Sequence, residues 1–303
     1  MNRTPIARTR RVGLLAAAFG IAACLFSAEG AFAAPQPFRD LQVQVVGEGR
    51  PVLMVPGLNS AAGVWTETCQ ALQPQVQCHI VQLPGFAGAP AVQDERFLEG
   101  MRDRLLAYLD ARGLDKPVVM GHSLGGVVAL MMAAEAPQRL DKLVVVDSLP
   151  FLAGIRHPQA TPEAARSMAA AMREQMLKAP SAQWEAQTRG SAQGMTRDPA
   201  GRERVVAWGL VSDRATTAQA MSELWGLDLR PLLPRIERPV LVLGAWAAYE
   251  PMGSTMASTR QLFEQQYAGL KQVQVRMSER GYHFLMWDDA PWLVNEVKAF
   301  LAR

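Results

Sequence analysis

Short runs of β-branched and other apolar residues recur along the chain, and several of them are continuous rather than alternating. Continuous apolar runs are typical of parallel strands that helices cover on both faces. Segments with helical patterning separate the runs, and this alternation predicts βαβ units and an α/β fold with a doubly wound, mostly parallel sheet. The predicted strands are residues 41–46, 52–55, 79–82, 118–120, 143–146, 240–243 and 273–277.

Residues 150–236 differ in composition from the rest of the chain. The valine-rich runs stop there, and helical segments rich in alanine, methionine and tryptophan take their place. We interpret this region as a helical cap inserted into a core formed by residues 34–149 and 237–303. A methionine stripe on one predicted cap helix fits either a roof over an apolar pocket or helix packing alone. The stripe consists of Met168, Met172 and Met176.

A G-x-S-x-G pattern occupies residues 121–125, between a predicted strand and a predicted helix. This arrangement is typical of a nucleophile elbow, a sharp turn that presents a serine at the carboxyl end of a strand. Gly121 and Gly125 fit the turn because the strand and the helix pass too closely for a Cβ atom. Ser123 is therefore the candidate nucleophile, at the edge where doubly wound sheets bind ligands.

A nucleophilic serine needs a histidine base and an acid that orients the base. The chain has four histidines. His122 adjoins the nucleophile and is expected to point the other way out of the turn, His79 opens an apolar run, and His157 lies in a polar stretch near prolines. His283 remains as the candidate base, because it follows the last predicted strand and precedes a predicted terminal helix at about residues 291–301.

The elbow, the place of His283 and the strand series together resemble the α/β-hydrolase superfamily, and the likeness extends over residues 41–301. The resemblance implies a serine hydrolase that cleaves carboxylic esters through an acyl-enzyme, with no cofactor. The apolar cap favours lipophilic small-molecule esters of small or medium size. Amidase or acyltransferase chemistry with the same triad stays open, as does a non-catalytic binding protein on a hydrolase scaffold.

The third member of the triad departs from the family's usual pattern. The resemblance implies an acid about three residues after Gly244, yet position 247 is alanine. Asp147 and Glu250 follow predicted strand ends and are the two substitutes. We favour Asp147, because it leaves the strand beside the nucleophile strand, as the acid does in some members of the superfamily. An ordinary turn aspartate is the other interpretation of Asp147.

The family stabilises the oxyanion with backbone N–H groups from the residue after the nucleophile and from the loop after an earlier strand. By this resemblance Leu124 is the first donor. Leu58 is the second, since Pro56-Gly57-Leu58 matches the oxyanion loop, with Pro56 in place of the more usual histidine.

Residues 1–33 have the parts of an export signal. A basic start precedes an apolar stretch at 12–26, and Ala31-Phe32-Ala33 matches an A-x-A cleavage site. We expect a periplasmic or secreted protein without a stable membrane span, and a lipid anchor at Cys24 is the alternative. Cleavage leaves 27 basic and 27 acidic residues, so the charge gives no support for a nucleic-acid partner.

Cys69 and Cys78 are the two cysteines that remain after such cleavage. In an oxidising compartment they are expected to form a small-loop disulfide, with two free buried thiols as the alternative. The sequence has no histidine, cysteine and carboxylate cluster at metal-ligand spacing, so no metal site is predicted. The length suits one sizeable domain, and the oligomeric state stays open.

Overall fold

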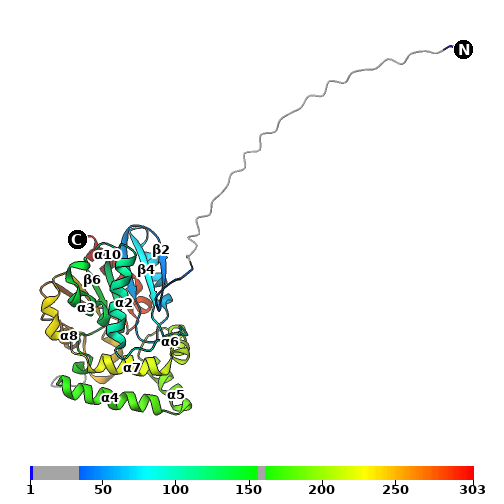
Figure 1. The fold of residues 1–303 in the computed structure, drawn as a ribbon. Helices are drawn as coiled ribbons and strands as arrows, with labels where there is room; N and C mark the ends of the chain where they lie inside the picture. The colour runs from blue at the N-terminus through cyan, green and yellow to red at the C-terminus, as the bar shows by residue number, and fades with distance from the viewer. Residues whose placement is uncertain (3–33, 156–160) are drawn as a thin grey trace. The chain divides into compact units, whose positions relative to one another are not determined.

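An eight-stranded, mostly parallel sheet forms the centre of the fold in the computed structural model (Figure 1). The structure describes residues 1, 2, 34–155 and 161–303. The predicted export signal and the alternative anchor at Cys24 fall on residues 3–33, and His157 falls on residues 156–160, so these lie outside the described residues. The described residues from Ala34 onward belong to one compact unit, which holds the sheet.

The strands follow the order β1-β2-β4-β3-β5-β6-β7-β8. β2 pairs antiparallel with β1 and β4, and all other neighbours pair in parallel. Every residue of β5 and of β7 is buried, as expected for strands with helices on both faces. The predicted fold class is confirmed. The strands are β1 (Gln36–Phe38), β2 (Leu41–Val46), β3 (Arg50–Val55), β4 (Val76–Gln82), β5 (Val118–His122), β6 (Leu143–Val146), β7 (Val240–Gly244) and β8 (Val273–Met277).

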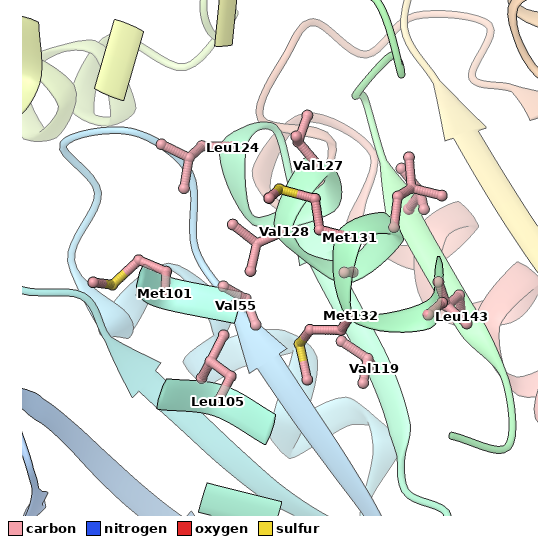
Figure 2. Close-up of a cluster of buried hydrophobic side chains, with 14 of the residues drawn as sticks. Val55, Met101, Leu105, Val119, Leu124, Val127, Val128, Met131, Met132 and Leu143 are labelled. Carbon is pink, nitrogen blue, oxygen red and sulfur yellow. The ribbon is translucent and has the colours of Figure 1, made fainter. Parts of the chain in front are cut away.

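Helices cover the sheet on both faces. On one face Val128 and Met132 of α3 lie in an apolar cluster with Val119 of β5, and α2 adds further side chains (Figure 2). On the other face Val118 and Met120 of β5 pack with residues of α1 and α10. Successive residues of β5 thus anchor it from opposite sides, which fixes the turn after the strand. The covering helices are α1 (Thr66–Leu72), α2 (Phe97–Ala111), α3 (Leu124–Glu135), α8 (Met256–Gln266), α9 (Leu285–Asp288) and α10 (Ala290–Leu301).

Four helices are inserted between β6 and β7, in agreement with a helical cap. α4 packs along α7, and α7 contacts α2 of the core (Figure 1). Asp198 and Asp213 cap the N-termini of α6 and α7 by accepting backbone hydrogen bonds. The cap limits at residues 150 and 236 stay a prediction. The inserted helices are α4 (Pro162–Lys178), α5 (Ser181–Ala192), α6 (Pro199–Val211) and α7 (Arg214–Gly226).

A disulfide joins Cys69 of α1 to Cys78 of β4, as predicted, and both residues are fully buried. A loop this short contributes roughly 2–3 kcal/mol by the chain-entropy account. No helix of the described residues is long and apolar enough to cross a membrane. Short 3₁₀ turns lie between the other elements of the described residues. They are η1 (Ala62–Trp65), η2 (Pro137–Arg139), η3 (Leu152–Ile155), η4 (Arg230–Arg235) and η5 (Ala247–Met252).

Candidate active site

Ser123 occupies the sharp turn between β5 and α3. Its backbone has φ 52° and ψ −118°, a strained conformation for a residue with a Cβ atom. A Cβ on Gly121 would lie 2.1 Å from the carbonyl oxygen of Gly125, and one on Gly125 would lie 2.2 Å from that of Val55. The backbone N–H of Ser123 donates to Val146 of β6 at 2.9 Å. These contacts hold the serine at the carboxyl edge of the sheet, as the motif predicts.

His283 and Asp147 meet at the same edge. Nδ1 of His283 lies 2.6 Å from Oδ2 of Asp147. The other carboxylate oxygen accepts the backbone N–H of Ala245, at the end of β7, at 2.8 Å. The Asp147 side chain is 8% exposed and that of His283 is 21% exposed. Because Asp147 engages Nδ1, Nε2 is the nitrogen of His283 left for proton exchange.

Glu250, the other candidate acid, lies on η5 and is exposed. Ala247, at the position where the family usually carries its acid, begins the same turn and is buried. Of the two substitutes, therefore, Asp147 is the one that contacts His283.

The loop after β3 approaches the nucleophile closely. A Cβ on Gly57 would lie 3.1 Å from Cβ of Ser123 and 3.0 Å from Nδ1 of His122. Only a glycine therefore lets this backbone pass without displacing a neighbour. Leu58 follows directly, and Leu124 is the first residue of α3. The backbone segments of both predicted oxyanion donors thus flank Ser123.

A cavity of about 190 Å³ opens beside these residues. Ser123, Asp147 and His283 all line it. Among the described residues, these last two are its only Asp, Glu, His, Lys or Arg side chains, and most of the remaining wall is apolar. The wall is completed by Leu124, Val127, Ser148, Leu149, Leu152, Ile155, Leu224, Ala245, Tyr249, Ser254, Thr259, Leu262 and Phe263.

The predicted cap region contributes Leu152 and Ile155 of η3 and Leu224 of α7 to this wall. From the four inserted helices, Leu224 of α7 is the residue that lines the cavity in the described part of the chain. Met168 of the methionine stripe is 45% exposed, and Trp208 of α6 packs against Trp287 of the core. Of the two interpretations of the stripe, helix packing is the one that fits, because none of its three methionines lines the cavity and α4 lies on the outer side of α7 (Figure 1).

Similarity to known proteins agrees with this geometry. A sequence profile described as the alpha/beta hydrolase fold matches residues 50–290, a stretch that contains Ser123, Asp147 and His283. The chain belongs to this family.

Curated relatives in the α/β-hydrolase family match a shorter stretch. A pimeloyl-[acyl-carrier protein] methyl ester esterase of Vibrio campbellii is 38% identical over 117 residues, which make up 39% of this chain and 44% of that protein. An enzyme of the same name from Vibrio cholerae is 36% identical over 110 residues, or 36% of this chain and 41% of that protein. The chain thus spans less than half the length of these relatives.

Solved structures match nearly the whole fold at low identity. A hydrolase from Pseudomonas aeruginosa has a TM-score of 0.71 and 20% identity, over 91% of this chain and all of that one. A thermophilic esterase from Thermogutta terrifontis has a TM-score of 0.69 and 20% identity, over 86% of this chain and 94% of that one. At 20% identity, the likeness to these two structures shows the fold alone.

His122 supports the loop that carries His283. Its Nε2 lies 3.0 Å from the backbone oxygen of His283, and the two ring centroids are 4.5 Å apart. Burial, together with the neighbouring His283, lowers the pKa of His122 well below its ordinary value. A neutral ring that donates from Nε2 satisfies this contact. The sequence excluded His122 as the base but carried no signal for this packing role.

Proposed function

We propose that the protein is a serine hydrolase that cleaves carboxylic esters with Ser123, His283 and Asp147. The observation that carries the proposal is the 2.6 Å contact between His283 Nδ1 and Asp147 Oδ2, at a cavity that Ser123 also lines. Asp147 orients the imidazole and stabilises its protonated form during turnover. The elbow and the family membership support the role of Ser123.

The proposed reaction proceeds in two halves. His283 takes the proton from Ser123 while the Ser123 Oγ atom attacks the ester carbonyl carbon. The backbone N–H groups of Leu58 and Leu124 stabilise the oxyanion, and His283 then returns the proton to the departing alcohol. Water, deprotonated by the same histidine, hydrolyses the acyl-enzyme and frees Ser123. The sequence of steps uses no cofactor.

The cavity supports small or medium-sized, largely apolar ester substrates. The two Vibrio relatives are named as methyl ester esterases, which favours esters over amides. The export pattern of residues 1–33 supports a periplasmic or secreted enzyme. The disulfide between Cys69 and Cys78 fits an oxidising compartment.

Hydrolysis of p-nitrophenyl butyrate tests the proposal. The wild-type protein should release p-nitrophenol with saturation kinetics, and Ser123→Ala should reduce kcat by at least about 10³-fold with the fold intact by circular dichroism. Ser181→Ala, at the exposed start of α5, is the matched control and should keep full activity. Undiminished hydrolysis by Ser123→Ala would refute the assignment.

A non-catalytic binding protein is the second candidate, because alanine occupies position 247. A folded wild-type protein that hydrolyses no ester and resists serine-directed probes would favour this candidate. Retention of a small apolar ester at equilibrium, without turnover, would then support it.

A further inference from the structure

The wall of the cavity carries the hydroxyl groups of Thr259 and Ser254 beside apolar side chains. Thr259 of α8 and Ser254, just before that helix, line the cavity beside Leu262 and Phe263. Thr259 is only 9% exposed, and its backbone N–H already donates to Thr255. Within residues 34–155 and 161–303, neither the Thr259 nor the Ser254 hydroxyl makes a hydrogen bond, in contrast to nearby Ser258.

The Thr259 side chain lines the cavity, where its hydroxyl can exchange a hydrogen bond to water for one to a bound ligand. Thr259 is therefore placed to bind a polar group that enters the cavity. Among the described residues the wall offers no Lys, Arg or further carboxylate to pair with a charge, which favours an uncharged group.

The segment with these hydroxyls follows β7, which β6 separates from β5 in the sheet. Ser123 follows β5, Asp147 follows β6 and Ser254 comes after β7, and these strands are direct neighbours in that order. At about 4.8 Å per strand spacing, the end of β7 lies roughly 10 Å from that of β5. Tyr267 of α8 donates its hydroxyl to Ser148 at 2.7 Å, which fixes α8 against the end of β6.

The size of the cavity limits the chain that fits. A volume of 190 Å³ corresponds to about six waters at roughly 30 Å³ each. It lies below the roughly 300–1,000 Å³ typical of pockets for drug-sized ligands.

The more exposed side of the site suits the leaving group. His283, which returns the proton to the alcohol, has a side chain that is 21% exposed, against 8% for Asp147. An alcohol that departs beside His283 is close to solvent. The rest of the cavity is then left for the acyl chain.

We propose that the cavity binds an uncharged acyl chain of about six non-hydrogen atoms with a carbonyl or hydroxyl oxygen near its far end. The Thr259 hydroxyl donates to that oxygen, and Ser254 assists. This substrate class rests on the proposed ester hydrolysis and makes Thr259 its specificity-determining residue.

Three methyl esters test the assignment: methyl hexanoate, methyl 5-oxohexanoate and monomethyl adipate. Wild-type kcat/KM should be about tenfold higher for the 5-oxo ester than for hexanoate, which is the ratio expected from one additional hydrogen bond. Monomethyl adipate should be hydrolysed at least about tenfold more slowly than hexanoate, because its carboxylate enters unpaired.

Thr259→Val should abolish the preference for the 5-oxo ester and leave hexanoate turnover equal or higher. Thr259→Ser should retain the preference, and Thr259→Ala provides the comparison if valine prevents folding. Ser254→Ala should reduce the preference by a smaller factor. Thr188→Val is the matched control, because the Thr188 hydroxyl donates to Trp184 within α5, away from the cavity.

A preference that survives in Thr259→Val and Thr259→Ala overturns the proposal, as does equal turnover of hexanoate and the 5-oxo ester by the wild type. Rapid hydrolysis of monomethyl adipate does so as well. Labelling of Ser123 by a fluorophosphonate separates the two levels. If Ser123 is labelled but the 5-oxo ester is not preferred, only the proposed substrate class is refuted. If the protein is neither labelled nor able to hydrolyse the esters, the proposed function is refuted as well.

Discussion

The ends of β6 and β7 lie side by side, yet they contribute differently to the site. Asp147 directly follows β6; it has φ 43° and contacts His283. β7 ends in Gly244 and is followed by Ala245, with Ala247 where the family usually carries its acid. The two ends are joined directly, since Asp147 donates its N–H to Leu243 at 2.7 Å and accepts that of Ala245 at 2.8 Å.

The difference shows that the place of the carboxylate in space matters more than the strand that bears it. β7 has no acid at position 247 but supplies a backbone donor that orients the acid of β6. The contact with Ala245 fixes one oxygen of Asp147 and leaves the other for His283. Neighbouring strands can thus exchange these two duties without moving the histidine.

The largest expected effect comes from removing the charge at the end of β6. Asp147→Asn should lower kcat for p-nitrophenyl butyrate by about 10⁴-fold, because the amide no longer holds the His283 tautomer that accepts the serine proton. Glu250→Gln, on the exposed turn after β7, is the matched control and should change kcat less than about twofold. A larger loss in Glu250→Gln than in Asp147→Asn would reverse the comparison.

Acid also lowers the free energy of unfolding through His79 of β4, which lies outside the ends of β6 and β7. Burial, with a smaller contribution from Arg112, lowers the pKa of His79 to about 4. Below about pH 6.5 His79 is protonated in the unfolded chain but stays neutral in the folded protein. The free energy of unfolding therefore falls as the pH drops toward 4. The loss amounts to about 3 kcal/mol.

Urea unfolding between pH 4.5 and 7.5 measures this loss. His79→Gln should flatten the decrease in the free energy of unfolding across that range. Asp147→Asn serves as the comparison and should retain the decrease. An unchanged slope in His79→Gln would place the acid sensitivity elsewhere.

A transplanted acid tests whether the two strand ends are interchangeable. Adding Ala247→Asp to Asp147→Asn should raise kcat about tenfold above the single variant, since β7 borders β6 and an acid there reaches the same edge. Ala247→Asp in the wild-type background should give no gain. If the double variant stays as slow as Asp147→Asn, the location of the acid on β6 is essential.

The smallest effect concerns the support behind Asp147. The hydroxyl of buried Tyr267 donates to the carbonyl of Ser148 at 2.7 Å. Tyr267→Phe leaves that carbonyl unpaired and should lower the free energy of unfolding by about 1–2 kcal/mol in urea titrations. Tyr282→Phe, at a partly exposed ring, should change it by less than about 0.5 kcal/mol. Equal losses in both variants would remove the special role of Tyr267.

The sequence predicts the features that depend on the pattern of residues within a short segment. The seven predicted strands are all present, because a continuous apolar run between helices has few other solutions. The elbow can be recognised because its pattern is contiguous and Gly121 contacts Gly125 four residues away, although the close contact of Gly125 with Val55 is distant in sequence. β1 was missed, since three residues at a partly exposed edge carry no periodic pattern.

Other features depend on contacts distant in sequence. The preference for Asp147 over Glu250 came from strand adjacency, but its contact with His283 joins residues 136 positions apart. The packing of His122 against His283 and the place of Thr259 in the cavity wall depend on how β5, the loop after β8 and α8 meet. The methionine stripe fitted either a roof or helix packing, and the position of α4 against α7 depends on contacts that its own periodicity does not encode.

The most direct measurement of the central claim is the rate at which a fluorophosphonate labels the purified protein, with the modified peptide identified by mass spectrometry. We predict labelling at Ser123 in the wild type, none in Ser123→Ala, and rates reduced by at least about 10²-fold in His283→Ala and Asp147→Asn. Labelling at wild-type speed in Asp147→Asn or His283→Ala, or modification of a serine other than Ser123, would contradict it.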